Sequence, residues 1–137
     1  MATKKERIGE ARQRLKTARD QWHRAAVASW EPIEPAECIT HSFYAFENAV
    51  TAAVLAVGLK TTTKHYEKEA LASQLVAQGK LKTDVSERLN ELNSVRKDVQ
   101  YGEAGASLIE KDLEDLVAEL DEFLSEVEHL VNESEGI

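Results

Sequence analysis

Apolar residues recur at steps of three and four positions through most of the chain, which is the spacing of an α-helix with one buried face. The pattern is clearest near the carboxyl end, where six aliphatic residues step by four, three, four, three and four positions: Leu113, Val117, Leu120, Leu124, Val127 and Val131. Prolines and glycines divide the chain into five such segments, at about 4–29, 35–57, 63–78, 84–101 and 107–132. The sequence therefore predicts an all-α protein.

The second segment is apolar on nearly every side. One face carries Ile39, Phe43, Phe46 and Val50, and alanines with Leu55 occupy the other sides. A helix that is hydrophobic all round is typical of the centre of a fold. We expect residues 35–57 to form a central, buried helix.

The other segments each carry a narrower apolar stripe. The residues expected to face inward from the first, third and fourth segments and from the wider stripe of the fifth are Ile8, Ala11, Leu15, Ala18, Trp22, Ala25, Ser29, Tyr66, Ala70, Leu71, Leu75, Val85, Leu89, Leu92, Val99, Leu116, Phe123 and Leu130. Capping signals open the fourth segment (Asp84 with Glu87) and the fifth (Ser107 with Glu110). Short connections between such helices favour an antiparallel up-and-down bundle of four to five helices, with residues 1–137 as one domain.

Composition and charge indicate where the protein acts and how its helices pack. No apolar stretch approaches the roughly 20 residues that span a bilayer, and no apolar run follows the basic amino terminus, so we expect a cytoplasmic protein without a membrane anchor. Residues 1–24 carry a net charge of +5 and residues 102–137 carry −11, within a total of −8. These oppositely charged helices are expected to lie side by side. The alternative, a basic stripe for nucleic-acid phosphates, is disfavoured because the whole chain is acidic.

The sequence contains few groups that point to catalysis. Phosphate-binding, dinucleotide-binding, zinc-protease and hydrolase motifs are absent, and the four histidines are scattered, so we expect no metal and no cofactor. The single cysteine, Cys38, is expected to be a small buried residue rather than a nucleophile, and it has no partner for a disulfide.

Arg96 is the residue that departs from its surroundings. On a helical wheel at about 100° per residue it falls about 20° from Val85, between Leu89 and Leu92, in the middle of the apolar stripe. Burying a guanidinium costs several kcal/mol unless it is paired. Two interpretations remain open at this point. Arg96 either reaches water or pairs with an acid such as Glu47, or it is held in a cleft or at a subunit interface to meet a phosphate or a carboxylate.

Three strings of residues together resemble the HEPN domain family of small prokaryotic all-α domains. These strings are AECITHSFYAFENAVTAAVLAVGL, TTTKHYEKEALASQLVAQGKL and SERLNELNSVRKDVQYGE. They include an aromatic centre at Phe43–Phe46, a Gly-Leu loop at Gly58, a Thr/Lys/His cluster ending at His65 and a motif running from Arg96 to Gly102. The similarity extends over about residues 8–130.

The resemblance implies a toxin–antitoxin or defence protein that forms a homodimer through its second and fourth helices, with a nucleotidyltransferase as a partner protein. Ribonuclease members of the family carry an arginine and a histidine that are separated by four to six residues. Here Arg96 matches the arginine, but Tyr101 occupies the histidine position, and a phenol with a pKa of roughly 10 is a poor base at neutral pH.

The resemblance thus leaves three functions to be weighed. The leading one is an interaction module that binds RNA or a nucleotide, without catalysis, through Arg96, Glu47 and Tyr101. The second is a metal-independent endoribonuclease toxin that uses Arg96 with Tyr101 or His65. The third is a structural adaptor that binds another protein through its charged terminal helices.

Overall fold

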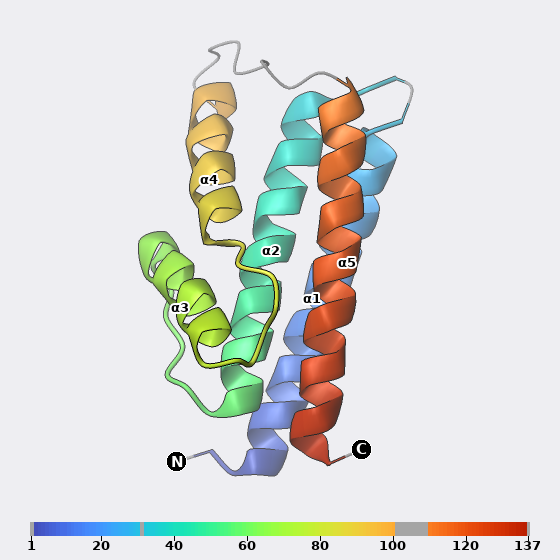
Figure 1. The fold of residues 1–137 in the computed structure, drawn as a ribbon. Helices are drawn as coiled ribbons and strands as arrows, with labels where there is room; N and C mark the ends of the chain where they lie inside the picture. Colours follow the sequence, from blue (N-terminus) through green and yellow to red (C-terminus); the bar gives the residue numbers. More distant parts are fainter. Residues whose placement is uncertain (1, 31, 101–109, 137) are drawn as a thin grey trace.

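The computed structural model describes residues 2–30, 32–100 and 110–136, and for residues 98–100, 110 and 111 it describes the backbone alone. Over these residues the chain forms five helices and no strand (Figure 1). The helices are α1 (Lys4–Ala28), α2 (Pro35–Val57), α3 (His65–Ala77), α4 (Ser86–Gln100) and α5 (Glu110–Glu135). The predicted all-α class is confirmed, and the helices begin and end within two or three residues of their predicted limits.

The five helices pack around α2. This helix contacts each of the other four, while α1 also contacts α5 and α3 also contacts α4. In Figure 1, α1 and α4 run in one direction and α2 and α5 in the opposite direction, with the short α3 lying across the lower half of α2. The expected central position of the second helix is therefore confirmed.

Helix α2 is buried along nearly its whole length. Pro35 occupies its first turn, where a missing N–H costs nothing, and Gly58 ends it in the left-handed conformation with φ of 80°. The rings of Phe43 and Phe46 are 1 % exposed, and the Phe46 ring lies 5.7 Å from that of Phe123 on α5. Burying each such side chain contributes on the order of 1.5–3 kcal/mol.

The oppositely charged helices α1 and α5 lie beside each other, as the charge pattern predicted. Arg19 Nη1 lies 2.6 Å from Asp121 Oδ1. Arg12, nearer the start of α1, forms an ion pair with Glu135 at the end of α5. The Trp22 indole N–H donates to the Val117 carbonyl at 3.0 Å across the same interface. All of the apolar positions predicted for α5 are buried.

The start of α4 differs from its predicted start at Asp84. The Val85 carbonyl accepts the first helical hydrogen bond, from the Leu89 N–H at 2.9 Å, so Val85 is the residue that caps the helix. Asp84 instead accepts the Ser86 N–H at 2.9 Å from just before the helix. Val85, Leu89 and Leu92 are buried as predicted.

The inward face of α3 was predicted only in part, since Leu75 is buried as expected and Leu71 packs against the core. Tyr66 is 65 % exposed and Ala70 is exposed, while Leu71 is half-buried. The face that turns toward the bundle carries His65, Lys68, Ala72 and Leu75. His65 and Lys68 are polar but lie on this face because both contact the buried carboxylate of Glu47 on α2. A search for stripes of apolar residues does not detect such a face.

Several predicted features fall outside the described residues: Tyr101, Gly102, Gly105, the Ser107–Glu110 cap and the side chain of Val99. No helix in the ranges that the structure describes is long and apolar enough to cross a membrane.

Candidate functional site

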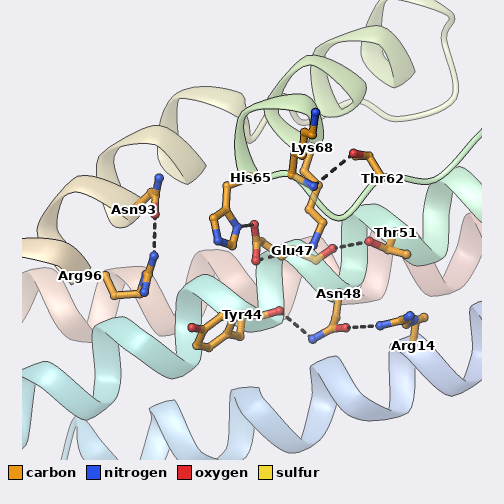
Figure 2. A network of polar contacts seen from close by, with 11 residues as sticks. Arg14, Tyr44, Glu47, Asn48, Thr51, Thr62, His65, Lys68, Asn93 and Arg96 are labelled. Carbon is orange, nitrogen blue, oxygen red and sulfur yellow. Dashed lines mark hydrogen bonds and ion pairs between the residues drawn. The ribbon is translucent and has the colours of Figure 1, made fainter. Parts of the chain in front are cut away.

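Arg96 lies on the side of α4 that faces α2, as its position in the apolar stripe predicted. Its guanidinium carbon is 5.0 Å from the centre of the Phe43 ring and 5.8 Å from that of Tyr44. One terminal nitrogen, Nη2, donates to Asn93 Oδ1 at 2.9 Å (Figure 2). The aromatic faces attract the cation, and this attraction offsets part of the cost of its partial burial.

The positive charge of Arg96 is not neutralised within the described residues. No carboxylate there forms an ion pair with Arg96, and its buried Nε atom has no hydrogen-bond partner. A guanidinium carries five N–H donors and stays protonated at any ordinary pH. As far as the described residues go, Arg96 therefore keeps both charge and donors that no acid occupies.

Glu47 is not the partner of Arg96, which corrects the pairing considered from the sequence. The Glu47 side chain is buried in α2, and its carboxylate is held from α3. His65 Nδ1 hydrogen bonds to Glu47 Oε2, and Lys68 Nζ lies 3.8 Å from Oε1. Figure 2 shows both side chains reaching Glu47 from α3, while Arg96 comes from α4 and hydrogen bonds to Asn93. His65 and Lys68 already compensate the buried carboxylate of Glu47, so Arg96 is not required for this.

His65 is oriented by Glu47 and is also reachable from outside. Its side chain is 40 % exposed, and its ring centre lies 5.3 Å from that of Phe43. Because a carboxylate only accepts hydrogen bonds, the Nδ1 of His65 carries the proton in this contact. In the neutral imidazole, Nε2 is then the atom that accepts a proton. The arrangement matches a base held in place by a second group.

The ring of Phe43 connects the two functional groups. It contacts the guanidinium of Arg96 on one helix and the imidazole of His65 on another. We call this cluster, made of Phe43, Tyr44, Glu47, His65, Lys68, Asn93 and Arg96, the Arg96 site. It can bind an anion through Arg96 and exchange a proton through His65. Tyr101, the remaining residue singled out from the sequence, lies outside the described residues.

Four members of the Arg96 site were missed by sequence reasoning: Phe43, Tyr44, Lys68 and Asn93. Asn93 precedes Arg96 by three residues and so shares its helical face, which is a signal that the spacing did contain. Lys68 follows His65 by three residues on α3, and the two form a polar face that points at a carboxylate eighteen residues before His65. Phe43 was expected only as a core residue.

Cys38 is buried at the start of α2. Burial raises the pKa of its thiol from 9.0 to about 11, because a thiolate would lose its hydration there. At neutral pH the group stays protonated, and a protonated thiol is a weak nucleophile. The expectation that Cys38 is a small core residue is confirmed. Across the parts of the chain that the structure describes, no group of three or more His, Cys, Asp or Glu side chains is arranged to hold a metal ion.

Comparison with known proteins adds no relative: no family, no curated protein and no solved structure matches this chain.

Proposed function

We propose that this protein is a HEPN-like antiparallel helical bundle whose Arg96 site binds the phosphate of an RNA or a nucleotide. The proposal combines the resemblance of the sequence to that family with the chemistry of the site. Guanidinium groups that stack on aromatic rings are suited to phosphates because their planar fork of N–H donors matches two phosphate oxygens.

The observation that carries the proposal is the state of the Arg96 charge. The guanidinium is partly buried against Phe43 and Tyr44, held by Asn93 and left without a carboxylate among the described residues. An arginine whose role is only structural would be expected to reach an acid, and the nearest buried acid, Glu47, is already held by α3. A phosphate supplies the missing negative charge, and the adjacent aromatic rings offer stacking faces for a base.

Binding to a fluorescent single-stranded RNA of mixed sequence tests this proposal. Arg96→Gln is expected to weaken binding at least tenfold. Lys97→Gln is the matched control because Lys97 is an exposed cation on the same helix, and its loss should change binding less than twofold. Equal losses in the two variants would mean that only the general charge of α4 matters, and the proposed site would then be wrong.

The proposed assembly is a homodimer formed through α2 and α4, acting with a nucleotidyltransferase-type partner in a toxin–antitoxin or defence system. The resemblance supports this assembly. Light scattering at micromolar concentration tests the dimer, which is expected to have twice the 15.3 kDa mass of the chain. A particle of about 15 kDa would contradict it.

A second candidate, a metal-independent endoribonuclease, is favoured by the contact between His65 and Glu47. An imidazole oriented by a buried carboxylate is equipped to move a proton, and Arg96 contacts the same Phe43 ring. We expect no cleavage of a mixed RNA in EDTA under the leading proposal. Cleavage by the wild type that both Arg96→Ala and His65→Gln abolish would replace the leading proposal with this one.

The adaptor alternative makes the opposite prediction about Arg96. If the residue has no ligand, Arg96→Leu should leave stability unchanged or raise it, because it removes an unpaired buried charge, and RNA binding should be absent in the wild type. Detectable RNA binding that Arg96→Leu removes would exclude this alternative.

A further inference from the structure

A cavity outside the Arg96 site lies where α1, α2 and the loop between α2 and α3 meet. Its volume is about 440 Å³, which is within the range of pockets that hold small molecules. Arg14 of α1, Thr51 of α2, Lys68 of α3 and the loop residues from Lys60 to Thr63 line it. We call it the 60–63 pocket. It shares only Lys68 with the Arg96 site, and Figure 2 shows Arg14, Thr51, Thr62 and Lys68 at the end of the network remote from Arg96.

The charges of the 60–63 pocket favour an anion. Three cations line it, and of these only Lys68 forms an ion pair with a described carboxylate, that of Glu47. Arg14 Nη1 lies 3.5 Å from Asn48 Oδ1, and Lys68 Nζ lies 3.8 Å from Glu47. Lys60 forms no ion pair with any described residue.

Two carboxylates also line the pocket, but they do not balance the cations. Glu67 already accepts the Thr62 hydroxyl and lies 4.0 Å from Lys64 Nζ, a cation that does not line the pocket. Glu10 is exposed on α1. Three cations face two carboxylates, so a ligand with two negative charges would gain more from Arg14, Lys60 and Lys68 than it would lose to Glu10 and Glu67.

The backbone of the loop adds hydrogen-bond donors. The N–H groups of residues 60–63 donate no hydrogen bond to any described residue. The loop leads directly into α3, and Lys64, the residue that caps this helix, makes no side-chain hydrogen bond to it. The first turn of an α-helix presents free N–H groups and partial positive charge, which stabilise a nearby anion.

We propose that the 60–63 pocket binds a small phosphorylated metabolite of sugar-phosphate size. The phosphate, a dianion near neutral pH, would lie against Arg14, Lys60 and Lys68. Threonine hydroxyls and the carboxylate of Glu10 would accept hydrogen bonds from sugar hydroxyls in the rest of the cavity. This site is distinct from the Arg96 site and does not depend on the function proposed for it.

Titration of the ¹⁵N-labelled full chain with ribose 5-phosphate, followed by amide chemical shifts, tests the proposal. At constant ionic strength the shifts are expected to saturate and to concentrate in residues 60–68. Inorganic phosphate should shift the same amides but bind more weakly, because it lacks the hydroxyl contacts. Sodium chloride alone should not reproduce them. Saturable shifts that are spread over lysines throughout the surface would overturn the proposal.

Charge variants give the sharper test, because removing a cation and removing a carboxylate should change the affinity for phosphate in opposite directions. Lys60→Gln and Arg14→Gln should each weaken binding of inorganic phosphate about tenfold, whereas Glu10→Gln should strengthen it several-fold by removing a repulsive charge. Lys80→Gln, at an exposed lysine in the loop after α3, is the matched control and should change nothing. If Glu10→Gln weakens phosphate binding, or if Lys80→Gln matches Lys60→Gln, the pocket is not an anion site.

Arg96→Gln separates the two proposals. It should weaken RNA binding at least tenfold and leave the ribose 5-phosphate titration unchanged. Loss of both in this variant would mean that the phosphate binds at the Arg96 site, and the 60–63 pocket would then have no ligand of this class.

Discussion

Glu47 is the most deeply buried charged residue in the described structure, with 3 % of its surface exposed. Its neighbours explain how α2 tolerates it. Lys68 keeps only 16 % of its side-chain surface exposed while it stays beside the carboxylate, and His65 adds a hydrogen bond. Removing one partner of a buried ion pair leaves the other without compensation, which costs more than the pair itself contributes.

Glu47→Gln should therefore lower the free energy of unfolding by about 1–3 kcal/mol, because the amide keeps a hydrogen bond to His65 but leaves the Lys68 charge unpaired. Urea denaturation followed by circular dichroism measures the change. Glu128→Gln, at an exposed position of α5, is the control and should stay within about 0.5 kcal/mol of the wild type. Equal effects of the two changes would contradict the importance of the contact with α3.

Cys38 makes the stability of the fold sensitive to alkali. Its pKa is about 11 in the folded chain and 9.0 when the thiol is exposed, so above pH 9 the unfolded chain loses a proton that the folded chain keeps. Stability from this group is therefore lost as the pH rises from 9 toward 11. Between pH 8 and pH 10 the loss should be about 1 kcal/mol.

Comparison of wild type with Cys38→Ala isolates this contribution, because lysines and tyrosines titrate equally in both chains. The stability of the variant should fall less between pH 8 and pH 10. Rapid reaction of the native thiol with a disulfide reagent at pH 8 would show instead that Cys38 is accessible, against its burial in the structure.

At the scale of elements, the end of α2 shows how one residue joins two helices. Gly58 has φ of 80°, and an added Cβ atom would lie 2.9 Å from Arg7 Nη1. The same nitrogen donates to the Leu55 carbonyl at 2.9 Å, so α1 adds a second donor to a carbonyl that also accepts the Gly58 N–H at 3.2 Å. A glycine is required here for its conformation and for the room it leaves to Arg7.

Gly58→Ala is expected to destabilise the protein by about 1–3 kcal/mol, the sum of left-handed strain and a displaced hydrogen bond. Gly9→Ala is the matched change. Gly9 lies inside α1 with nothing within 4 Å of its added Cβ, so alanine should stabilise the chain by about 0.5–1 kcal/mol. Thermal unfolding should rank the three chains as Gly9→Ala, wild type and Gly58→Ala, and any other order would contradict this account.

At the scale of the whole molecule, one core joins all five helices, and α2 is enclosed by its own chain. The apolar faces of α2 contact α1, α3, α4 and α5. The burial of α2 therefore needs no second subunit, and the proposed dimer depends on the family resemblance alone. The interface between α1 and α5 combines partly exposed ion pairs with buried apolar residues of both helices. Such ion pairs contribute less than about 1 kcal/mol each, so the buried apolar residues carry most of the stability.

Leu120 belongs to the hydrophobic core and is 0 % exposed. Leu120→Asp places a carboxylate among buried apolar side chains and should abolish the folded state. Ala118→Asp makes a comparable change two residues earlier on the exposed side of α5 and should leave the helical circular dichroism spectrum intact. A folded Leu120→Asp chain would contradict the assignment of α5 to the core.

The sequence by itself determined the features that depend on neighbours along the chain. Helix limits, the burial of α2 and the position of Arg96 on an inward face all follow from spacings of three and four residues, because a helix converts those spacings into faces. The start of α4 was predicted two residues early since an aspartate just before a helix can bind its first N–H group without being its cap.

Only the tertiary structure decided which groups meet. Glu47 and His65 are eighteen residues apart on different helices, and their contact turned a polar face of α3 inward where an apolar one was expected. Arg96 met Phe43, Tyr44 and Asn93 instead of Glu47 for the same reason. Charge pairing and aromatic contact depend on the distance between side chains in space, and the periodicity of a single helix holds no information about that distance.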